Sequence, residues 1–165
     1  MNEMIYKEEW LEIIKAQEQK LRFSLFSCED ALYIGNQIVR LANEKYNGAV
    51  VVSIIEDDML VFYHKMQGAT MENDIWIYKK RNVSKETGVS SLRAYAEIKS
   101  GIREPTWRGR EESFVACGGC YPVRIADQKP FIYIAVSGLA HYLDHQVIVD
   151  AVARRLNTAV GEVGL

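Results

Sequence analysis

The stretch that decides the fold runs from Gly68 to Arg93 and reads GATMENDIWIYKKRNVSKETGVSSLR. A helix start is followed by a segment that mixes apolar and basic residues and stops at Gly88, where a helix-ending glycine is expected. Two serines then open a second helical segment. The stretch therefore predicts two consecutive helices, Met71 to Thr87 and Ser90 to Ser100.

Strand signals flank this helical pair on both sides. Before it, Ala49 to Ile55 is a continuous, mainly β-branched run, which is typical of a strand covered on both faces. An acidic turn leads from this run into a partner strand, Met59 to His64. After the pair, Tyr121 to Ala126 alternates apolar and polar residues, and Phe131 to Ser137 is a strong strand. The pattern predicts two hairpins separated by two helices.

Helices are expected at both ends of the chain. Lys7 to Lys20 has apolar residues at helical spacing, and Leu21 to Phe26 suits a short strand. Ser27 begins a second helix that ends near Asn47, and an apolar stripe from Leu143 to Leu156 predicts a closing helix. Two hairpins with helices between and around them favour the α+β class, with an antiparallel sheet flanked by helices.

The composition is that of a single globular domain. The chain has 165 residues, of which 48% are hydrophobic and 25% charged. Its formal net charge of -2 gives no electrostatic reason to expect nucleic acid or an anionic membrane. No apolar run approaches the roughly 18 residues that would span a bilayer. The N-terminus lacks an apolar signal core and three cysteines make no disulfide framework, so we expect a cytoplasmic protein.

Two later segments complete a resemblance: Cys117 to Arg124, CGGCYPVR, and Ser137 to His145, SGLAHYLDH. With Gly68 to Arg93, they resemble the uncharacterised branch of the haem-degrading-domain superfamily, the GlcG/HbpS-like proteins. The resemblance implies a profilin-like fold with an antiparallel sheet of about five strands. It covers residues 27–157, preceded by an N-terminal helix and short strand in 1–26 and followed by a tail, 158–165. It also implies a homo-oligomer, a dimer or a larger ring, and haem as a candidate cofactor.

Polar residues that match the family pattern, or that the fold could bring beside them, are the candidate ligand-binding residues: Arg81, Asn82, Ser91, Arg93, Arg124, Asp144 and His145. The argument centres on Arg93, because a helix start and an arginine one turn later suit a carboxylate or phosphate. The alternative is an arginine paired with a protein carboxylate such as Asp74 or Glu97. The neighbouring basic run Lys79-Lys80-Arg81 is interpreted as a solvated helix face, with Trp76 and Val83 turned to the core.

Metal binding is not expected. Cys117 and Cys120 form a C-x-x-C pair, but a strand pattern follows it and a structural zinc site needs about four ligands. The family usually has a histidine at the Cys117 position, so we expect two cysteines packed around a glycine turn. His141 and His145 lie four residues apart, as metal ligands often do, yet no third ligand follows them at a suitable distance.

No familiar catalytic motif is present, and haem rests on the resemblance alone, since every possible axial-ligand type occurs here. The leading hypothesis is a non-catalytic module that binds a small anionic ligand. An oligomeric adaptor is the alternative, and an enzyme acting on a small carboxylate-bearing metabolite ranks third. A deep polar pocket around the candidate residues would favour a ligand, whereas arginines in internal ion pairs would favour the adaptor. An oligomer is also expected from Trp10, Trp76 and Trp107, which all fall near predicted surface elements.

Overall fold

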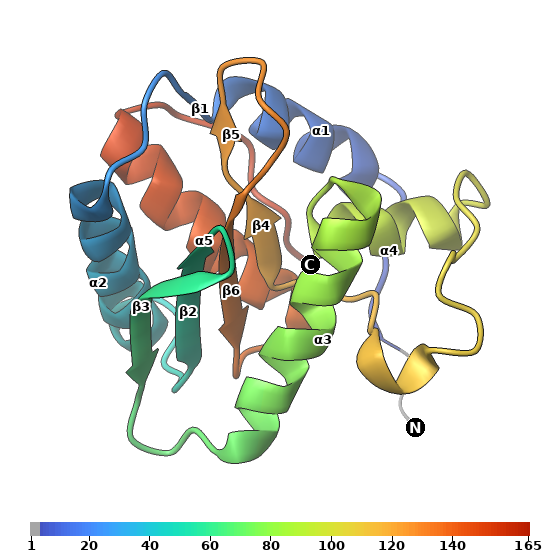
Figure 1. Cartoon of the computed structure of the whole chain (residues 1–165), viewed down its shortest axis with the longest axis horizontal. Helices are drawn as coiled ribbons and strands as arrows, with labels where there is room; N and C mark the ends of the chain where they lie inside the picture. Colours follow the sequence, from blue (N-terminus) through green and yellow to red (C-terminus); the bar gives the residue numbers. More distant parts are fainter. Residues whose placement is uncertain (1–3) are drawn as a thin grey trace.

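A four-stranded antiparallel sheet organises the protein in the computed structural model, which describes residues 4–165 (Figure 1). From edge to edge its strands are β3 (Met59–Lys65), β2 (Val51–Glu56), β6 (Ile132–Ser137) and β4 (Cys120–Pro122). The predicted hairpins are both present, because β2 pairs with β3 and β4 pairs with β6. The mixture of helices with a mainly antiparallel sheet agrees with the expected class, while the profilin-like description stays a prediction.

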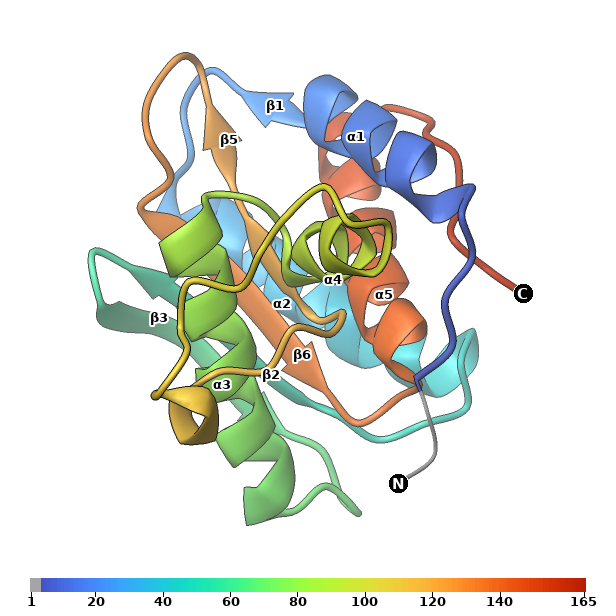
Figure 2. The same ribbon diagram turned by 90° about the vertical axis from the view of Figure 1, so that its right-hand side faces the viewer.

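The predicted strand from Tyr121 to Ala126 is wrong in one respect, because it is divided at Val123. Its first part is β4, and its second part, β5 (Arg124–Ile125), leaves the main sheet. β5 pairs in parallel with β1 (Arg22–Phe23), so the expectation of a purely antiparallel sheet is also corrected (Figure 2). The main sheet therefore has four strands, and the parallel pair ties the N-terminal part of the chain to the second hairpin.

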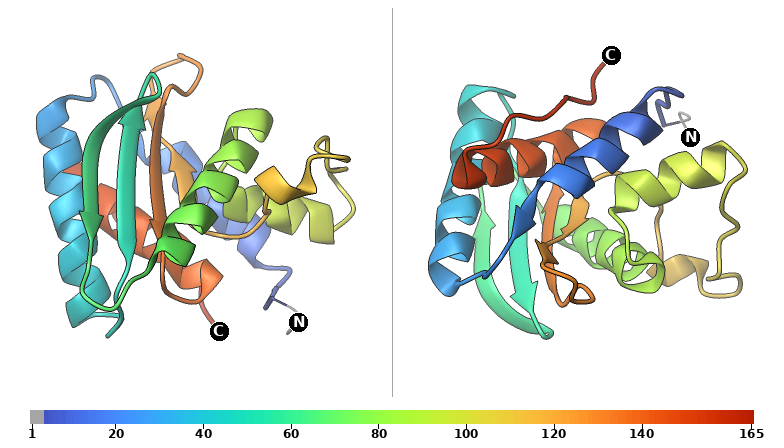
Figure 3. Two further views of the ribbon diagram at one scale, coloured as in Figure 1. Left: turned by 60° about the horizontal axis from the view of Figure 1, so that its bottom comes forward. Right: turned by 90° about the horizontal axis from the view of Figure 1, so that it is seen from above.

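Helices cover both faces of the sheet. α2 (Cys28–Glu44) and α5 (His141–Leu156) lie on one face, and α3 (Met71–Thr87) lies on the other (Figure 3). Alternate residues of the central strands explain this layering, since Val52 and Ile134 belong to the core beneath α2 and α5, whereas Val51 and Ala135 belong to the core beneath α3. The prediction that the Ala49 to Ile55 run is covered on both faces is confirmed.

Two further helices, α1 (Trp10–Lys20) and α4 (Ser91–Lys99), pack together beyond the β4 edge (Figure 1). The C-terminal residues join them, because the Trp10 indole donates to the Gly164 carbonyl at 3.1 Å. Trp10 and Trp107 are buried within the chain, so their expected place near the surface is wrong. Trp76 alone of the three is substantially exposed, at 37%. Residues 1–3 of the expected N-terminal unit 1–26 lie outside the described residues.

Local signals set the bounds of α3. Thr70 and Asn73 form a reciprocal capping box at its start, and Gly88 ends it in the left-handed conformation at φ 72°. The predicted range Met71 to Thr87 is confirmed. Between α4 and β4 the predicted loop contains a short 3₁₀ helix, Glu111–Ser113. Across residues 4–165, no helix is both long and apolar enough to cross a membrane.

Candidate ligand-binding site

The start of α4 carries the arrangement that the sequence predicted for an anion, and a carboxylate of the chain itself occupies it. Glu18 of α1 accepts hydrogen bonds from the Ser90 backbone N–H at 2.9 Å and from Arg93 Nη1 at 2.7 Å. Arg124 lies 3.6 Å from the same carboxylate. Glu18 is buried, with 3% of its surface exposed. The free backbone groups of a helix start and two arginines therefore serve an internal ion cluster.

The second carboxylate of this cluster is Glu97, the partner weighed as the alternative in the sequence. Arg93 Nε donates to Glu97 at 2.9 Å, and Arg103 donates to the other Glu97 oxygen at 2.7 Å. Burial alone would raise the pKa of Glu97, but hydrogen bonds from the two arginines hold it below its ordinary value. Arg93 is thus bonded to two carboxylates of the protein, Glu18 through Nη1 and Glu97 through Nε.

Three other candidates also bond within the protein. The Ser91 hydroxyl accepts from the Cys120 backbone N–H at 2.9 Å, which fixes α4 to β4. Arg81 donates to the Ser53 hydroxyl of β2 at 2.9 Å, and Asn82 donates to the Ser113 carbonyl at 2.8 Å. These contacts attach α3 and α4 to the strands and to the loop that follows α4.

His145 faces α1, whereas its neighbour Asp144 bonds to α3. Its Nε2 lies 2.8 Å from the side-chain oxygen of Gln17, and the imidazole is fully buried. Burial lowers the pKa of His145 to about 3, so the ring is neutral at physiological pH. Its Nδ1 has no hydrogen-bond partner within residues 4–165.

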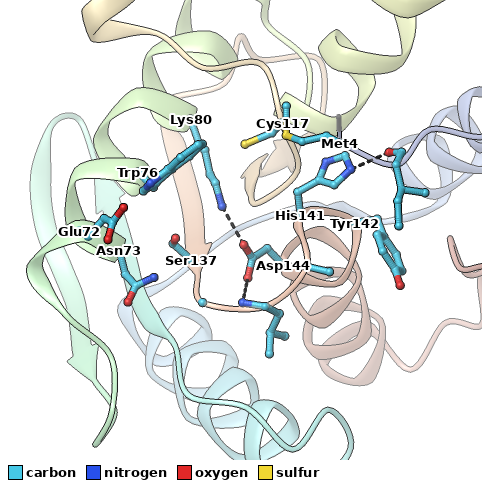
Figure 4. Close-up of a pocket in the computed structure, with 14 residues that line it drawn as sticks. Met4, Glu72, Asn73, Trp76, Lys80, Cys117, Ser137, His141, Tyr142 and Asp144 are labelled. Atoms are coloured by element: carbon cyan, nitrogen blue, oxygen red, sulfur yellow. Dashed lines mark hydrogen bonds and ion pairs between the residues drawn. The ribbon is translucent and has the colours of Figure 1, made fainter. Parts of the chain in front are cut away.

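Asp144 forms a buried ion pair with Lys80, as Figure 4 shows. The Lys80 ammonium and the Asp144 carboxylate are 2.8 Å apart, with 2% and 3% of their side chains exposed. Lys80 also donates to the Val136 carbonyl at 3.0 Å, and the other Asp144 oxygen accepts from the Leu139 N–H at 2.9 Å. Burial opposes the charge of Lys80, but Asp144 outweighs it and raises the pKa of Lys80. The pair joins α3 to α5 across the end of β6.

A cavity of about 470 Å³ opens beside this pair, between α3 and the start of α5 (Figure 4). Such a volume is within the range of small-molecule sites. Its walls combine aromatic, aliphatic and polar side chains with the backbone that follows β6: Met4, Ile5, Glu72, Asn73, Trp76, Lys80, Cys117, Ser137, Gly138, Leu139, Ala140, His141, Tyr142 and Asp144. Trp76 stands on the α3 side, and His141 and Tyr142 stand on the α5 side.

His141 is locked as a neutral ring at one end of the cavity. Its Nδ1 accepts from the Gly118 N–H at 3.2 Å, so the proton must be on Nε2, which donates to the Ile5 carbonyl at 2.8 Å. Burial lowers the pKa of His141 and favours this uncharged form. Cys117 is equally inert, since burial raises the pKa of its thiol to about 11. Within residues 4–165, no three His, Cys, Asp or Glu side chains cluster in a way that could hold a metal ion.

Of the seven candidate residues, Asp144 alone lines the cavity. The sequence interpretation missed Lys80 and Trp76, because it assigned Lys80 to a solvated face and turned Trp76 toward the core. Both assignments are wrong. A signal was available, since Asn73, Trp76 and Lys80 follow the i, i+3, i+7 spacing that places residues on one helix face.

Residues 26–153 match the family described as "Haem degrading protein HbpS-like", and the chain therefore belongs to that family. The expected resemblance is confirmed. A UPF0303 protein of Rhizobium meliloti is 32% identical over 150 residues, covering 87% of this chain and 88% of the relative. One from Streptomyces coelicolor is 30% identical over 143 residues, covering 86% and 90%.

Solved structures agree with this fold. The crystal structure of the Ybr137w protein superposes with a TM-score of 0.76 at 20% identity, covering 93% of this chain and 99% of that one. The structure of a PduOC:heme complex has a TM-score of 0.66 at 18% identity and covers 84% and 99%. At these identities the likeness establishes the architecture, and what each protein binds is a property of that protein.

Proposed function

We propose that the chain is a non-catalytic small-ligand-binding module and that its site is the cavity between α3 and the start of α5. The observation that carries the proposal is the combination of an open cavity with a charge-compensated floor, the Lys80–Asp144 pair. An exposed indole, Trp76, lies at its wall and offers a flat apolar surface for a ligand. Such a site can bind an apolar body without leaving a buried charge unpaired.

The chemistry of the cavity supports binding rather than catalysis. The Ser137 hydroxyl forms no hydrogen bond with a base among residues 4–165, and Cys117 is a neutral thiol. An activated nucleophile needs a neighbouring base or a lowered pKa. His141 cannot act as that base, because it is neutral and both of its ring nitrogens are already hydrogen-bonded. The enzyme alternative therefore has no support from the side chains that line this cavity.

Haem is one candidate ligand, because the family description names haem degradation and one structural neighbour was solved with heme. Iron ligation does not fit His141 as it stands, since one ring nitrogen accepts from Gly118 and the other donates to Ile5. Cys117 would have to lose a proton whose pKa is about 11. Haem in this cavity would be held by contacts with the apolar walls and by hydrogen bonds to the polar groups of the lining. We assign no role to its iron.

An oligomeric adaptor remains the second candidate, and one observation favours it. Apolar side chains are exposed along the edge strand β3 and on α3: Met59, Leu60, Tyr63, Met71, Ile75 and Tyr78. Exposed strand edges and apolar helix faces are common contact surfaces. A homo-oligomer in the cytoplasm agrees with this surface and with three free cysteines. Light scattering measures the oligomeric state, and a monomer at micromolar concentration would rule out the oligomer.

The cavity is tested by titrating the protein with haemin, 2-naphthoate and 2-naphthamide, followed by calorimetry. Trp76→Ala should weaken whichever probes bind by about tenfold, because it removes a large apolar wall. Tyr78→Ala is the matched control, since Tyr78 is an exposed aromatic residue of the same helix outside the cavity. The proposal fails if none of the three probes binds, or if both substitutions weaken binding equally.

A further inference from the structure

We infer that the ligand of this cavity enters with a carboxylate that is held at the start of α5, by the Ser137 hydroxyl, the first backbone N–H groups of the helix and Lys80. The inference rests on the proposed function and names the class of ligand: a flat, largely apolar molecule with one carboxylate. It replaces the start of α4 as the anion site, because Glu18 already fills that position.

The start of α5 has backbone donors without a cap. α5 is 16 residues long, and Ala140, which precedes it, provides no side-chain hydrogen bond. By contrast, α2 and α4 are capped by Ser27 and Ser90. The N–H groups of His141 and Tyr142 have no hydrogen-bond partner within the described chain, and both residues line the cavity. Uncapped first-turn donors at a helix N-terminus attract negative charge.

Ser137 gives an independent indication of a ligand. It ends β6, is 95% buried with 5% of its surface exposed, and lines the cavity. Its hydroxyl has no hydrogen-bond partner among residues 4–165, and it is not one of the fully buried unpartnered atoms, so it opens to the cavity. Figure 4 shows Ser137 between Trp76 and Asp144, in the middle of the side chains that surround the cavity. A ligand oxygen in the cavity can therefore accept a hydrogen bond from this hydroxyl, which no group of the described chain uses.

Lys80 adds a third type of donor. An ammonium group has three N–H donors, and Lys80 uses two of them, on Asp144 and on the Val136 carbonyl. The Asp144 oxygens are both engaged, one by Lys80 and the other by Leu139. The inner end of the cavity therefore offers unused donors and no unused carboxylate. Glu72, the other acid of the lining, is exposed to solvent. This polarity selects an anion at the inner end and leaves the apolar body beside Trp76.

The test compares two probes of equal shape, 2-naphthoate and 2-naphthamide, by calorimetry on the full chain at neutral pH. Wild-type protein should bind the acid about tenfold more tightly than the amide, because only the acid makes charge-assisted hydrogen bonds. Ser137→Ala should remove most of this preference by weakening the acid alone, and Ser137→Thr, which retains the hydroxyl, should preserve it. Ser24→Ala, an exposed serine far from the cavity lining, is the matched control.

The outcomes separate this inference from the proposed function. Equal affinities for acid and amide in wild-type protein overturn it, even if Trp76→Ala weakens both and the cavity is thereby supported. Equal losses of both probes in Ser137→Ala also overturn it. If Ser137→Ala does not fold, Ser137→Thr takes its place. The inference stands if wild type and Ser137→Thr both prefer the acid, and it fails if either protein does not. If neither naphthyl probe binds, the inference fails as well, and haemin binding alone would leave the cavity proposal standing.

Discussion

The cluster at the start of α4 and the pair at the start of α5 are built from similar groups, yet they present different chemistry. At α4, Arg93 is bonded to Glu18 and Glu97, and the helix start is closed by Glu18. At α5, Lys80 and Asp144 neutralise each other beside a cavity, and the helix start is uncapped. The density of basic residues therefore does not locate an anion site. What locates it is which donors remain after the protein's own carboxylates have been placed.

The largest effect should follow from breaking the α5 pair. Lys80→Met leaves Asp144 buried without a partner and should lower the free energy of unfolding by about 3–5 kcal/mol. The double variant Lys80→Met/Asp144→Leu should recover more than half of that loss.

Arg93→Met should cost only about 1–2 kcal/mol, because Arg93 is partly exposed and Glu18 keeps its bond to Ser90. Urea unfolding measures all three, and a larger loss for Arg93→Met would reverse the comparison.

Emptying the α4 site should convert it into the anion site that the sequence predicted. Glu18→Ala should cost about 1–3 kcal/mol, because Arg93, Arg124 and the Ser90 N–H lose their shared acceptor. Added acetate should restore part of the melting temperature relative to chloride at equal ionic strength. Neither wild type nor Glu12→Ala, an exposed glutamate of the same helix, should respond to acetate. Equal acetate responses in all three proteins would show that the site is not specific.

Acid sensitivity should distinguish the two histidines of α5. The pKa of His145 in the folded state is about 3, well below the roughly 6.5 of an unfolded histidine, so the unfolded state binds more protons between these values. The free energy of unfolding should therefore be constant above about pH 6.5 and decrease below it. The loss should reach about 1.4 kcal/mol at one pH unit below about 6.5. The pKa of His141 is also lowered, with the same sign.

Urea unfolding between about pH 5 and about pH 7 measures this dependence. His145→Gln should flatten it more than His141→Gln, because His145 is fully buried whereas His141 is only partly buried. If the free energy of unfolding depends equally on pH in wild type and in His145→Gln, the dependence does not come from His145.

The smallest effects for each substituted residue concern Cys117 and Cys120. Cys117→Ala/Cys120→Ala should keep the fold at a cost of about 1 kcal/mol for each buried thiol, and the purified wild type should contain no stoichiometric zinc. A thiol reagent should label the exposed Cys28 first, because burial raises the pKa of both other thiols to about 11. Zinc that is lost in the double variant, or faster labelling of Cys117, would contradict this description of the glycine turn.

The sequence predicted features that depend on neighbouring residues. The bounds of α3 follow from Thr70, Asn73 and Gly88, which lie within or beside the helix they delimit. The covered strand β2 follows from its own β-branched run. The parallel pairing of β1 with β5 was missed, because it joins Arg22 to Arg124 and local alternation does not show which strands pair with each other.

By itself, the sequence determined the family, the order of helices and strands, and the residue types available for binding. Only the tertiary structure decided which of those residues are already paired. Glu18 is 75 positions from Arg93, and Asp144 is 64 positions from Lys80. Capping and periodicity act over a few residues, whereas an ion pair depends on where the whole chain brings two side chains and how far it removes them from water. For that reason Arg93 and Arg124, which looked available, are paired with Glu18, and the open cavity lies beside Lys80, which looked like ordinary surface.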